Sequence, residues 1–221
     1  MHGVNDAIAL GRATVPAQLA VPGVVAIARG VEADTVEAIA EALLRAGIRA
    51  FEVTLNEPTD RALSGIERVA ARFGGDELLV GAGTVLSREA GQRALDAGAR
   101  FLVMPHTDPD LVAWAAALGV PVFPGALTPT EVLAAWRAGA TAVKLFPASV
   151  AGPAAIREIH GPLPDIPLIP TGGVSADNAA AFIKAGAVAI GVGGWLIGDG
   201  RPGGIAERGA RIVTAVAEAR G

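Results

Sequence analysis

Lys144 is the residue whose type and position suggest chemistry most directly. The chain contains only two lysines and 16 arginines, so arginine evidently supplies most of its positive surface charge. Lys144 lies in the middle of an apolar run at residues 142–146. A buried amine can lose its proton and attack a carbonyl, whereas a guanidinium stays protonated. Lys144 is therefore a candidate Schiff-base nucleophile, and the alternative is a lysine that reaches from a strand end into solvent.

Glu52 is the acidic residue that the strand pattern directs toward this amine. Successive side chains of a strand point to opposite faces. In the segment FEVTL at 51–55 the three apolar residues share one face, so Glu52 and Thr54 share the other. The same alternation points Lys144 away from its two apolar neighbours. An acid beside an amine nucleophile suits proton transfer during catalysis, and the alternative is a structural ion pair.

The elements that must position these two side chains recur along the chain. Five times a helix-like stretch ends in a glycine, and an apolar strand begins within a few residues. Glycine at that place suits the left-handed backbone that commonly ends a helix. The five glycines are Gly47, Gly98, Gly119, Gly139 and Gly186.

Eight strands are predicted from these five repeats and three further apolar runs. They cover residues 24–27, 50–54, 78–81, 101–103, 120–123, 141–145, 167–170 and 188–192. Amphipathic stretches between them, such as 34–46 and 87–97, predict helices, with N-caps at Asp34, Ser87 and Ser175. Eight such units predict an α/β fold, a (β/α)8 TIM barrel, with an open doubly wound sheet as the alternative. We expect one domain over 1–221, with an extra N-terminal helix over the first 20 residues covering the bottom of the barrel.

In such a barrel the active site lies at the carboxyl ends of the strands. Arg29 ends the first strand and can clamp a substrate carboxylate, although it can equally be a surface arginine. Thr84 follows the third strand, where its hydroxyl can donate to an anion. Glycine-rich segments at 170–175 and 191–195 follow the last two strands, where many barrels bind phosphate; the alternative is two tight turns. His106 follows the fourth strand, and we expect it near the pocket without a catalytic role.

Composition argues against several other classes of protein. The net charge of −4, without long runs of one sign, gives no reason to expect a nucleic-acid or membrane-surface partner. The chain has no cysteine, and its three histidines lack the spacing of metal ligands. It begins without the features of a signal peptide, and no apolar run reaches about 18 residues. We therefore expect a cytoplasmic protein that needs no metal.

Four segments, taken together, carry a resemblance to a known family. They are FEVTL at 51–55, GAGTV at 81–85, VKLFPA at 143–148 and PTGGV at 170–174. In this order they closely resemble the 2-keto-3-deoxy-6-phosphogluconate (KDPG) aldolase family, which includes 4-hydroxy-2-oxoglutarate aldolases and 6-phosphogalactonate relatives. The resemblance runs from about Val24 to about Gly194, which is nearly the whole predicted barrel.

The resemblance implies a class I aldolase that cleaves such keto acids to pyruvate and glyceraldehyde 3-phosphate or glyoxylate. Lys144 would be the Schiff-base nucleophile and Glu52 the general acid/base, in a homotrimer without a cofactor. The implied substrate-binding residues are Arg29 and Thr84 at the pyruvyl carboxylate, Pro105 and Phe146 at the pyruvyl group, and Thr171, Gly172, Gly173 and Gly193 at the phosphate end, with Gly194 beside them.

Two positions depart from the pattern of the family. Asn56 stands where some members have arginine, which is more like the phosphogalactonate branch, and Arg29 is expected to take over that anion. Gly194 stands where serine is common, so one hydroxyl donor is missing from the last glycine-rich segment. Two alternatives to the aldolase are a metal-free phosphosugar isomerase or epimerase and a non-catalytic barrel that binds sugar phosphates.

Overall fold

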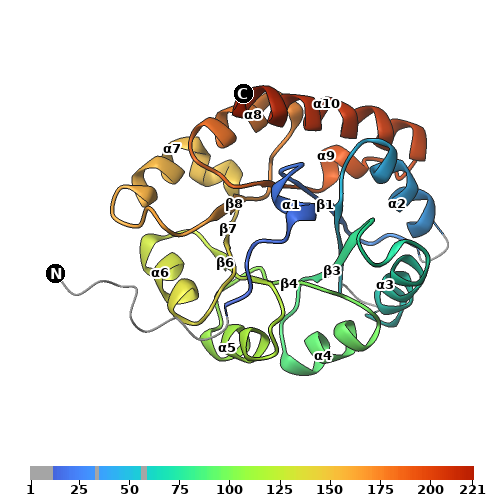
Figure 1. The fold of residues 1–221 in the computed structure, drawn as a ribbon, viewed down its shortest axis with the longest axis horizontal. Coiled ribbons are helices and arrows are strands. Elements are labelled where there is room, and N and C mark those ends of the chain that lie inside the picture. Colours follow the sequence, from blue (N-terminus) through green and yellow to red (C-terminus); the bar gives the residue numbers. More distant parts are fainter. Residues whose placement is uncertain (1–11, 33–34, 56–58) are drawn as a thin grey trace.

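The computed structural model describes residues 12–32, 35–55 and 59–221, which form an α/β fold on parallel strands (Figure 1). The strands are β1 (Val24–Ala28), β2 (Ala50–Thr54), β3 (Leu79–Gly83), β4 (Leu102–Val103), β5 (Val122–Phe123), β6 (Gly125–Ala126), β7 (Val143–Leu145), β8 (Leu168–Pro170) and β9 (Ile190–Val192). The helices are α1 (Ala17–Ala20), α2 (Val36–Arg45), α3 (Thr59–Phe73), α4 (Arg88–Asp96), α5 (Pro109–Ala117), α6 (Pro129–Arg137), α7 (Ala148–His160), α8 (Ala176–Lys184), α9 (Gly194–Ile197) and α10 (Pro202–Arg220).

The strands pair as two parallel sheets, and the longer helices surround them (Figure 1). Six strands follow the order β5-β4-β3-β2-β1-β9, and three follow the order β6-β7-β8. Only Pro124 separates β5 from β6 in the chain. Proline has no N–H to donate to a ladder, but the Pro124 carbonyl accepts from the Lys144 N–H at 2.9 Å. The predicted fifth strand at 120–123 is thus continued by a second short strand, which gives nine segments where we expected eight.

The local signals for helix ends are largely confirmed. All five glycines that were expected to end helices have positive φ, between 71° and 109°. Ser87 and Ser175 cap α4 and α8 by accepting from backbone N–H groups, and Ser175 takes part in a capping box. The predicted cap Asp34 lies outside the described residues. The N-cap of α2 is Thr35, whose hydroxyl donates to Glu32 O at 3.0 Å and does not cap the helix.

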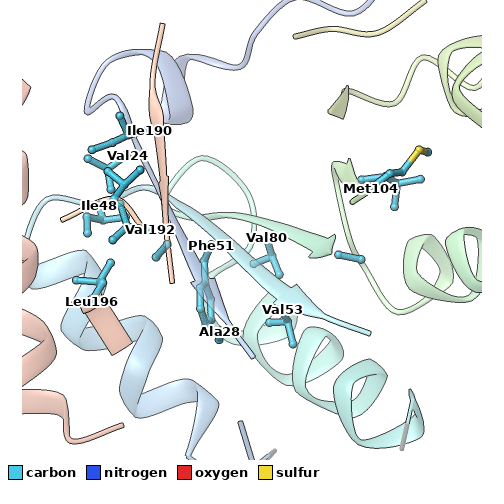
Figure 2. Close-up of a cluster of buried hydrophobic side chains, with 14 of the residues drawn as sticks. Val24, Ala28, Ile48, Phe51, Val53, Val80, Met104, Ile190, Val192 and Leu196 are labelled. Carbon is cyan, nitrogen blue, oxygen red and sulfur yellow. The ribbon is translucent and has the colours of Figure 1, made fainter. Parts of the chain in front are cut away.

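Apolar side chains pack in two layers on opposite faces of the strands. The outer layer lies between strands and helices, and Figure 2 shows part of it, with Phe51 and Val53 on β2 and Val80 on β3. The inner layer gathers side chains from six of the nine strands and from residues that flank strands. Among them are Phe101, just before β4, and Phe123 on β5, whose ring centroids lie 5.7 Å apart. The strands therefore turn one face to the helices and the other to a shared interior.

The predicted N-terminal helix is much shorter than expected. Residues 12–16 are not helical, and α1 covers only four residues. Pro16 is extended and precedes α1, and Gly23, with φ 68°, follows it, so neither flank can extend the helix. The prediction is wrong for 12–16, and residues 1–11 lie outside the described residues. Leu19 on α1 is nevertheless fully buried in the inner layer, so this short helix closes one end of the interior.

We expect Leu19→Ala to lower the free energy of unfolding by about 2–5 kcal/mol, because it leaves a cavity in a packed interior. Val21→Ala is the matched control, since Val21 lies two residues away and is 76% exposed; its cost should stay within about 0.5 kcal/mol. Urea unfolding followed by circular dichroism measures both. Equal losses in the two variants would contradict the role assigned to Leu19.

Candidate active site

Two adjoining cavities lie on either side of Lys144. The outer cavity has a volume of about 620 Å³, and the inner one, about 10 Å³, has roughly the space of one water molecule. The outer cavity is lined by Ile27, Arg29, Lys144, Phe146, Thr171, Gly172, Gly173, Val174, Ser175, Gly193, Gly194 and Trp195. The inner cavity is lined by Val25, Ile27, Glu52, Val103, Phe123, Lys144, Ile169, Thr171 and Gly191. Lys144 borders both, as do Ile27 and Thr171.

Lys144 points into the interior from β7, as the alternation predicted. Its neighbours Val143 and Leu145 pack in the outer layer against the helices, and Lys144 itself is only 7% exposed. Its Nζ lies 5.0 Å from the centroid of the Phe146 ring, on the cavity side. The amine is therefore removed from bulk water but open to a ligand in the outer cavity. It is not the solvent-directed lysine of the alternative reading.

Glu52 faces the same interior from β2, where it is 2% exposed. Its neighbours Phe51 and Val53 pack in the outer layer, so the alternation on this strand is confirmed as well. Burial raises the pKa of the Glu52 carboxyl, and the positive charges of Lys144 and Arg29 offset part of that rise. A carboxyl with a raised pKa can both take up and return a proton near neutral pH.

The space for the Glu52 carboxyl exists because the facing residue is glycine. Glu52 and Gly81 are register partners across β2 and β3, and Gly83 follows on the same face of β3. A Cβ added at Gly83 would overlap a carboxylate oxygen of Glu52. Gly191 makes room for the Thr171 hydroxyl in the same way. Two glycines of the interior are therefore fixed by the polar side chains that they face.

We expect Gly83→Ala to lower kcat/KM by about 100-fold or more, because the new methyl group displaces a carboxyl that must be held within hydrogen-bond reach. Gly203→Ala is the control, since a Cβ there meets nothing within 4 Å and its φ is not positive. Steady-state kinetics of both variants measures the effect. Wild-type activity in Gly83→Ala would show that the position of the carboxyl does not matter.

Most of the predicted binding residues gather at the outer cavity. Arg29, Phe146 and the glycine-rich residues after β8 and β9 all line it. Its only charged lining residues, among those that the structure describes, are Arg29 and Lys144, and both are cationic. An anionic ligand therefore suits this cavity.

Three predicted residues do not line either cavity. Thr84, Pro105 and His106 are absent from both linings, and His106 is exposed. Thr84 has φ 58°, a left-handed backbone that is uncommon for a β-branched residue. The Pro105 carbonyl instead approaches the backbone of Gly125 closely, where a Cβ would not fit. Asn56, which stands where some members of the family have arginine, lies outside the described residues.

Several lining residues were not predicted. Trp195 lies on the wall of the outer cavity. Its position at the end of the last glycine-rich segment, 191–195, was a usable signal. Ile27 borders both cavities from β1, and strand alternation alone would have placed it inward. Ile169 and Phe123 belong to the inner cavity because they too alternate toward the interior.

The described residues contain neither a cluster of metal ligands nor a membrane-spanning helix. In 12–32, 35–55 and 59–221, no three His, Asp or Glu side chains gather closely enough to hold a metal ion. Within the same ranges, no helix combines the length and apolar character needed to cross a membrane.

The model of one known protein family matches most of the chain. The model of the KDPG and KHG aldolase family matches residues 15–203, which include both cavities. This chain belongs to the KDPG and KHG aldolase family. It is an aldolase, and aldolases of this kind are carbon–carbon lyases that act on small molecules.

Relatives that are named as aldolases, and solved structures, give the same relationship. A probable 2-dehydro-3-deoxy-6-phosphogalactonate aldolase of Rhizobium meliloti (strain 1021) is 39% identical over 181 residues, which is 81% of this chain and 84% of that protein. A 2-dehydro-3-deoxy-phosphogluconate aldolase of Pseudomonas aeruginosa is 38% identical, over 77% of this chain and 74% of that protein.

Among solved structures, a native KDPGal structure superposes with a TM-score of 0.83 at 34% identity, covering 89% of this chain and 95% of that one. A KDPG aldolase from Legionella pneumophila, with pyruvate captured at low pH as a covalent carbinolamine intermediate, gives a TM-score of 0.78 at 26% identity. It covers 91% of this chain and 96% of its own. The fold of this aldolase is thus shared with an enzyme whose structure holds covalently captured pyruvate.

Proposed function

We propose that the chain cleaves a 2-keto-3-deoxy-6-phospho sugar acid, of the gluconate or galactonate type, or 4-hydroxy-2-oxoglutarate, through a Schiff base on Lys144. The observation that carries this proposal is the position of Lys144. Its buried amine separates a large cation-lined cavity from a small pocket that holds the Glu52 carboxyl. The Legionella pneumophila relative, with its covalent carbinolamine of pyruvate, supports the same chemistry.

The proposed cycle uses only Lys144, Glu52 and water. The unprotonated amine of Lys144 attacks the C2 ketone, and loss of water from the carbinolamine gives a protonated imine, which is an electron sink. Glu52, directly or through one water molecule, takes the proton of the C4 hydroxyl. The C3–C4 bond breaks, its electron pair enters the imine system, and an aldehyde and an enamine result. Glu52 returns its proton to C3, and hydrolysis releases pyruvate and the free amine.

The outer cavity suits the anionic remainder of such a substrate. We assign Arg29 and Thr84 to the pyruvyl carboxylate and Phe146 and Pro105 to the pyruvyl group. The roles of Thr84 and Pro105 depend on the resemblance, since neither residue lines either of the two cavities. We assign the phosphate end to Thr171, Gly172, Gly173, Gly193 and Gly194, because these residues of the two glycine-rich segments line the outer cavity.

The closure of the barrel, the number of domains and the oligomeric state are further parts of the proposal. We infer that β1 to β9 form one closed (β/α)8 barrel and that 1–221 is a single domain. The bridge between Thr171 and Gly191, the Val188 N–H that donates to Leu168 O at 3.1 Å, and the continuity of β5 and β6 support closure. A homotrimer in the cytoplasm, working without a cofactor, is proposed on the resemblance alone.

The test is a cleavage assay coupled to lactate dehydrogenase, which reports pyruvate. The phosphogluconate, phosphogalactonate and unphosphorylated 2-keto-3-deoxy acids and 4-hydroxy-2-oxoglutarate are compared side by side. We expect pyruvate from at least one of them, with the largest kcat/KM for a phosphorylated acid. Sugar-phosphate interconversion without pyruvate would indicate an isomerase or epimerase. Ligand-induced thermal stabilisation without any turnover would indicate a non-catalytic binding barrel.

A further inference from the structure

Two side chains outside the cavity hold the glycine-rich loops at its far end. Asn178 on α8 contacts the loop that follows β8. Arg208 on α10 contacts α9, the short helix that follows directly on the loop after β9. Neither residue lines a cavity. We propose that Asn178 and Arg208 are positioning residues that set the affinity for the anionic end of the substrate without touching it. This inference rests on the proposed function, which assigns that end to these loops.

Asn178 bonds the backbone of its loop at two places. Its Nδ2 donates to Gly173 O at 2.9 Å, and its Oδ1 accepts from the Ser175 N–H at 2.9 Å. The Gly172 carbonyl is bonded separately, by the Ser149 N–H at 2.9 Å. Both glycine carbonyls are thus occupied by protein donors, and the backbone N–H is the only other polar group that a glycine can offer to an anion.

The conformation of this loop needs such support. Gly172 and Gly173 both have positive φ, 92° and 78°, and glycine loses more conformational freedom on folding than any other residue. Two adjacent glycines have no side chains with which to fix themselves. The amide of Asn178 matches one carbonyl and one N–H, so it favours one conformation of the loop over its alternatives.

Arg208 holds the second loop through one short helical turn. Its Nε donates to Leu196 O at 2.8 Å and its Nη2 to Ile197 O at 3.1 Å. The N–H groups of Leu196 and Ile197 in turn donate to Gly193 O, at 2.9 and 3.0 Å. The guanidinium therefore bonds the carbonyls of the same two residues whose N–H groups fix the carbonyl of a cavity-lining glycine. A four-residue helix is too short to be stable alone, so its geometry depends on this contact.

The chain also keeps space for this guanidinium. A Cβ at Gly198 would lie 2.7 Å from the Arg208 Nη2, and a Cβ at Gly204 would lie 2.9 Å from Nη1. Lysine cannot replace the contact, because it offers one point charge in place of a planar fork that reaches two carbonyls.

The expected consequence is a selective change in affinity. If either side chain is removed, the loop that it contacts samples more conformations. Ordering that loop then costs part of the free energy of binding the anionic end of the substrate. The pyruvyl end, which meets Lys144, does not depend on these loops. We expect Arg208→Met and Asn178→Ala each to raise KM for the phosphorylated acid by about tenfold, as for the loss of one or two hydrogen bonds, with kcat changed by less than about threefold. Arg208→Lys should restore little of the lost affinity.

Two further measurements and a control variant make the test specific. The KM for the unphosphorylated 2-keto-3-deoxy acid, and the pyruvate concentration that gives half-maximal borohydride trapping on Lys144, should both change by less than about twofold, because neither ligand carries a phosphate. Arg201→Met is the matched control, since this exposed arginine directly precedes α10 and, among the described residues, forms its ion pair with Asp199, at 3.3 Å.

A failure of the positioning role can be distinguished from a failure of the proposed function. If the wild-type protein cleaves none of the acids, the proposed function fails. If it does cleave one, equal changes for pyruvate and the phosphorylated acid, or no change for either, overturn the positioning role. Should Arg208→Met not fold, as judged by circular dichroism, Asn178→Ala decides the question on the same measurements.

Discussion

Lys144→Arg is expected to abolish the covalent adduct that wild-type protein forms with pyruvate and borohydride. The substituted guanidinium keeps a positive charge in the interior but cannot lose its proton to attack a ketone. Cleavage activity should fall by roughly 10⁴-fold or more, the scale seen when a covalent nucleophile is removed. Intact-mass spectrometry measures the adduct, and peptide mapping of the wild-type protein should locate it on Lys144.

The chain offers an unusually clean control for this experiment. Lys184 is the only other lysine of the sequence, and it is exposed at the end of α8. Lys184→Arg should therefore leave both the adduct and the activity at wild-type levels. An adduct that persists in Lys144→Arg but disappears in Lys184→Arg would refute the proposed site.

Glu52→Gln is expected to reduce kcat by about 10²–10⁴-fold, the usual contribution of a positioned acid/base. Glutamine keeps the shape of the side chain in the space left by Gly83 but cannot carry the proton from C4. Imine formation does not need C4 chemistry, so borohydride trapping of pyruvate should persist in this variant. Loss of trapping together with cleavage would show that Glu52 acts at an earlier step.

Glu52→Gln should also have a larger free energy of unfolding than wild type, by an amount that depends on pH. Burial raises the pKa of Glu52, so the folded state holds this proton more tightly than the unfolded state does. Below the unfolded pKa, near 4.3, both states are protonated and Glu52 costs nothing. As pH rises above that value the unfolded chain releases its proton first, and wild type loses stability that Glu52→Gln retains.

Urea unfolding at several pH values measures this difference. Glu52→Gln should be the more stable protein at pH 7, and its advantage should shrink toward zero as the pH falls to about 4. A difference that stays constant across this range would mean that the carboxyl is not responsible.

Strand alternation was the part of the site that sequence could predict. Glu52 and Lys144 point inward because successive side chains of a strand alternate between its two faces, and neighbouring segments do not change this alternation. The glycines that end helices were predictable for a similar local reason. Those local rules place the acid and the amine in one interior even though 92 residues separate them in the chain.

The remaining features depend on contacts that local patterns do not encode. Pro124 separates β5 from β6 because it lacks an N–H, yet its carbonyl still accepts from the Lys144 N–H, so the fifth strand continues past its predicted end. The expected N-terminal helix shrinks to α1, since Pro16 and Gly23 flank a segment that Leu19 anchors in the interior. Pro105 and His106 follow a strand end as predicted, but the loop turns toward Gly125 rather than the cavity. The side on which a loop folds back is decided by its tertiary partners.

The tight fit between Glu52 and Gly83 limits the order in which substitutions at these two positions can accumulate during evolution. The methyl group of an alanine at position 83 would displace the carboxyl of the longer acid at position 52. We therefore expect strong epistasis between the two positions, because alanine at 83 leaves the acid in place only when that acid is shorter. A library that varies position 83 alone would report it as immutable, whereas paired variation, such as aspartate at 52 with alanine at 83, opens routes that single steps close.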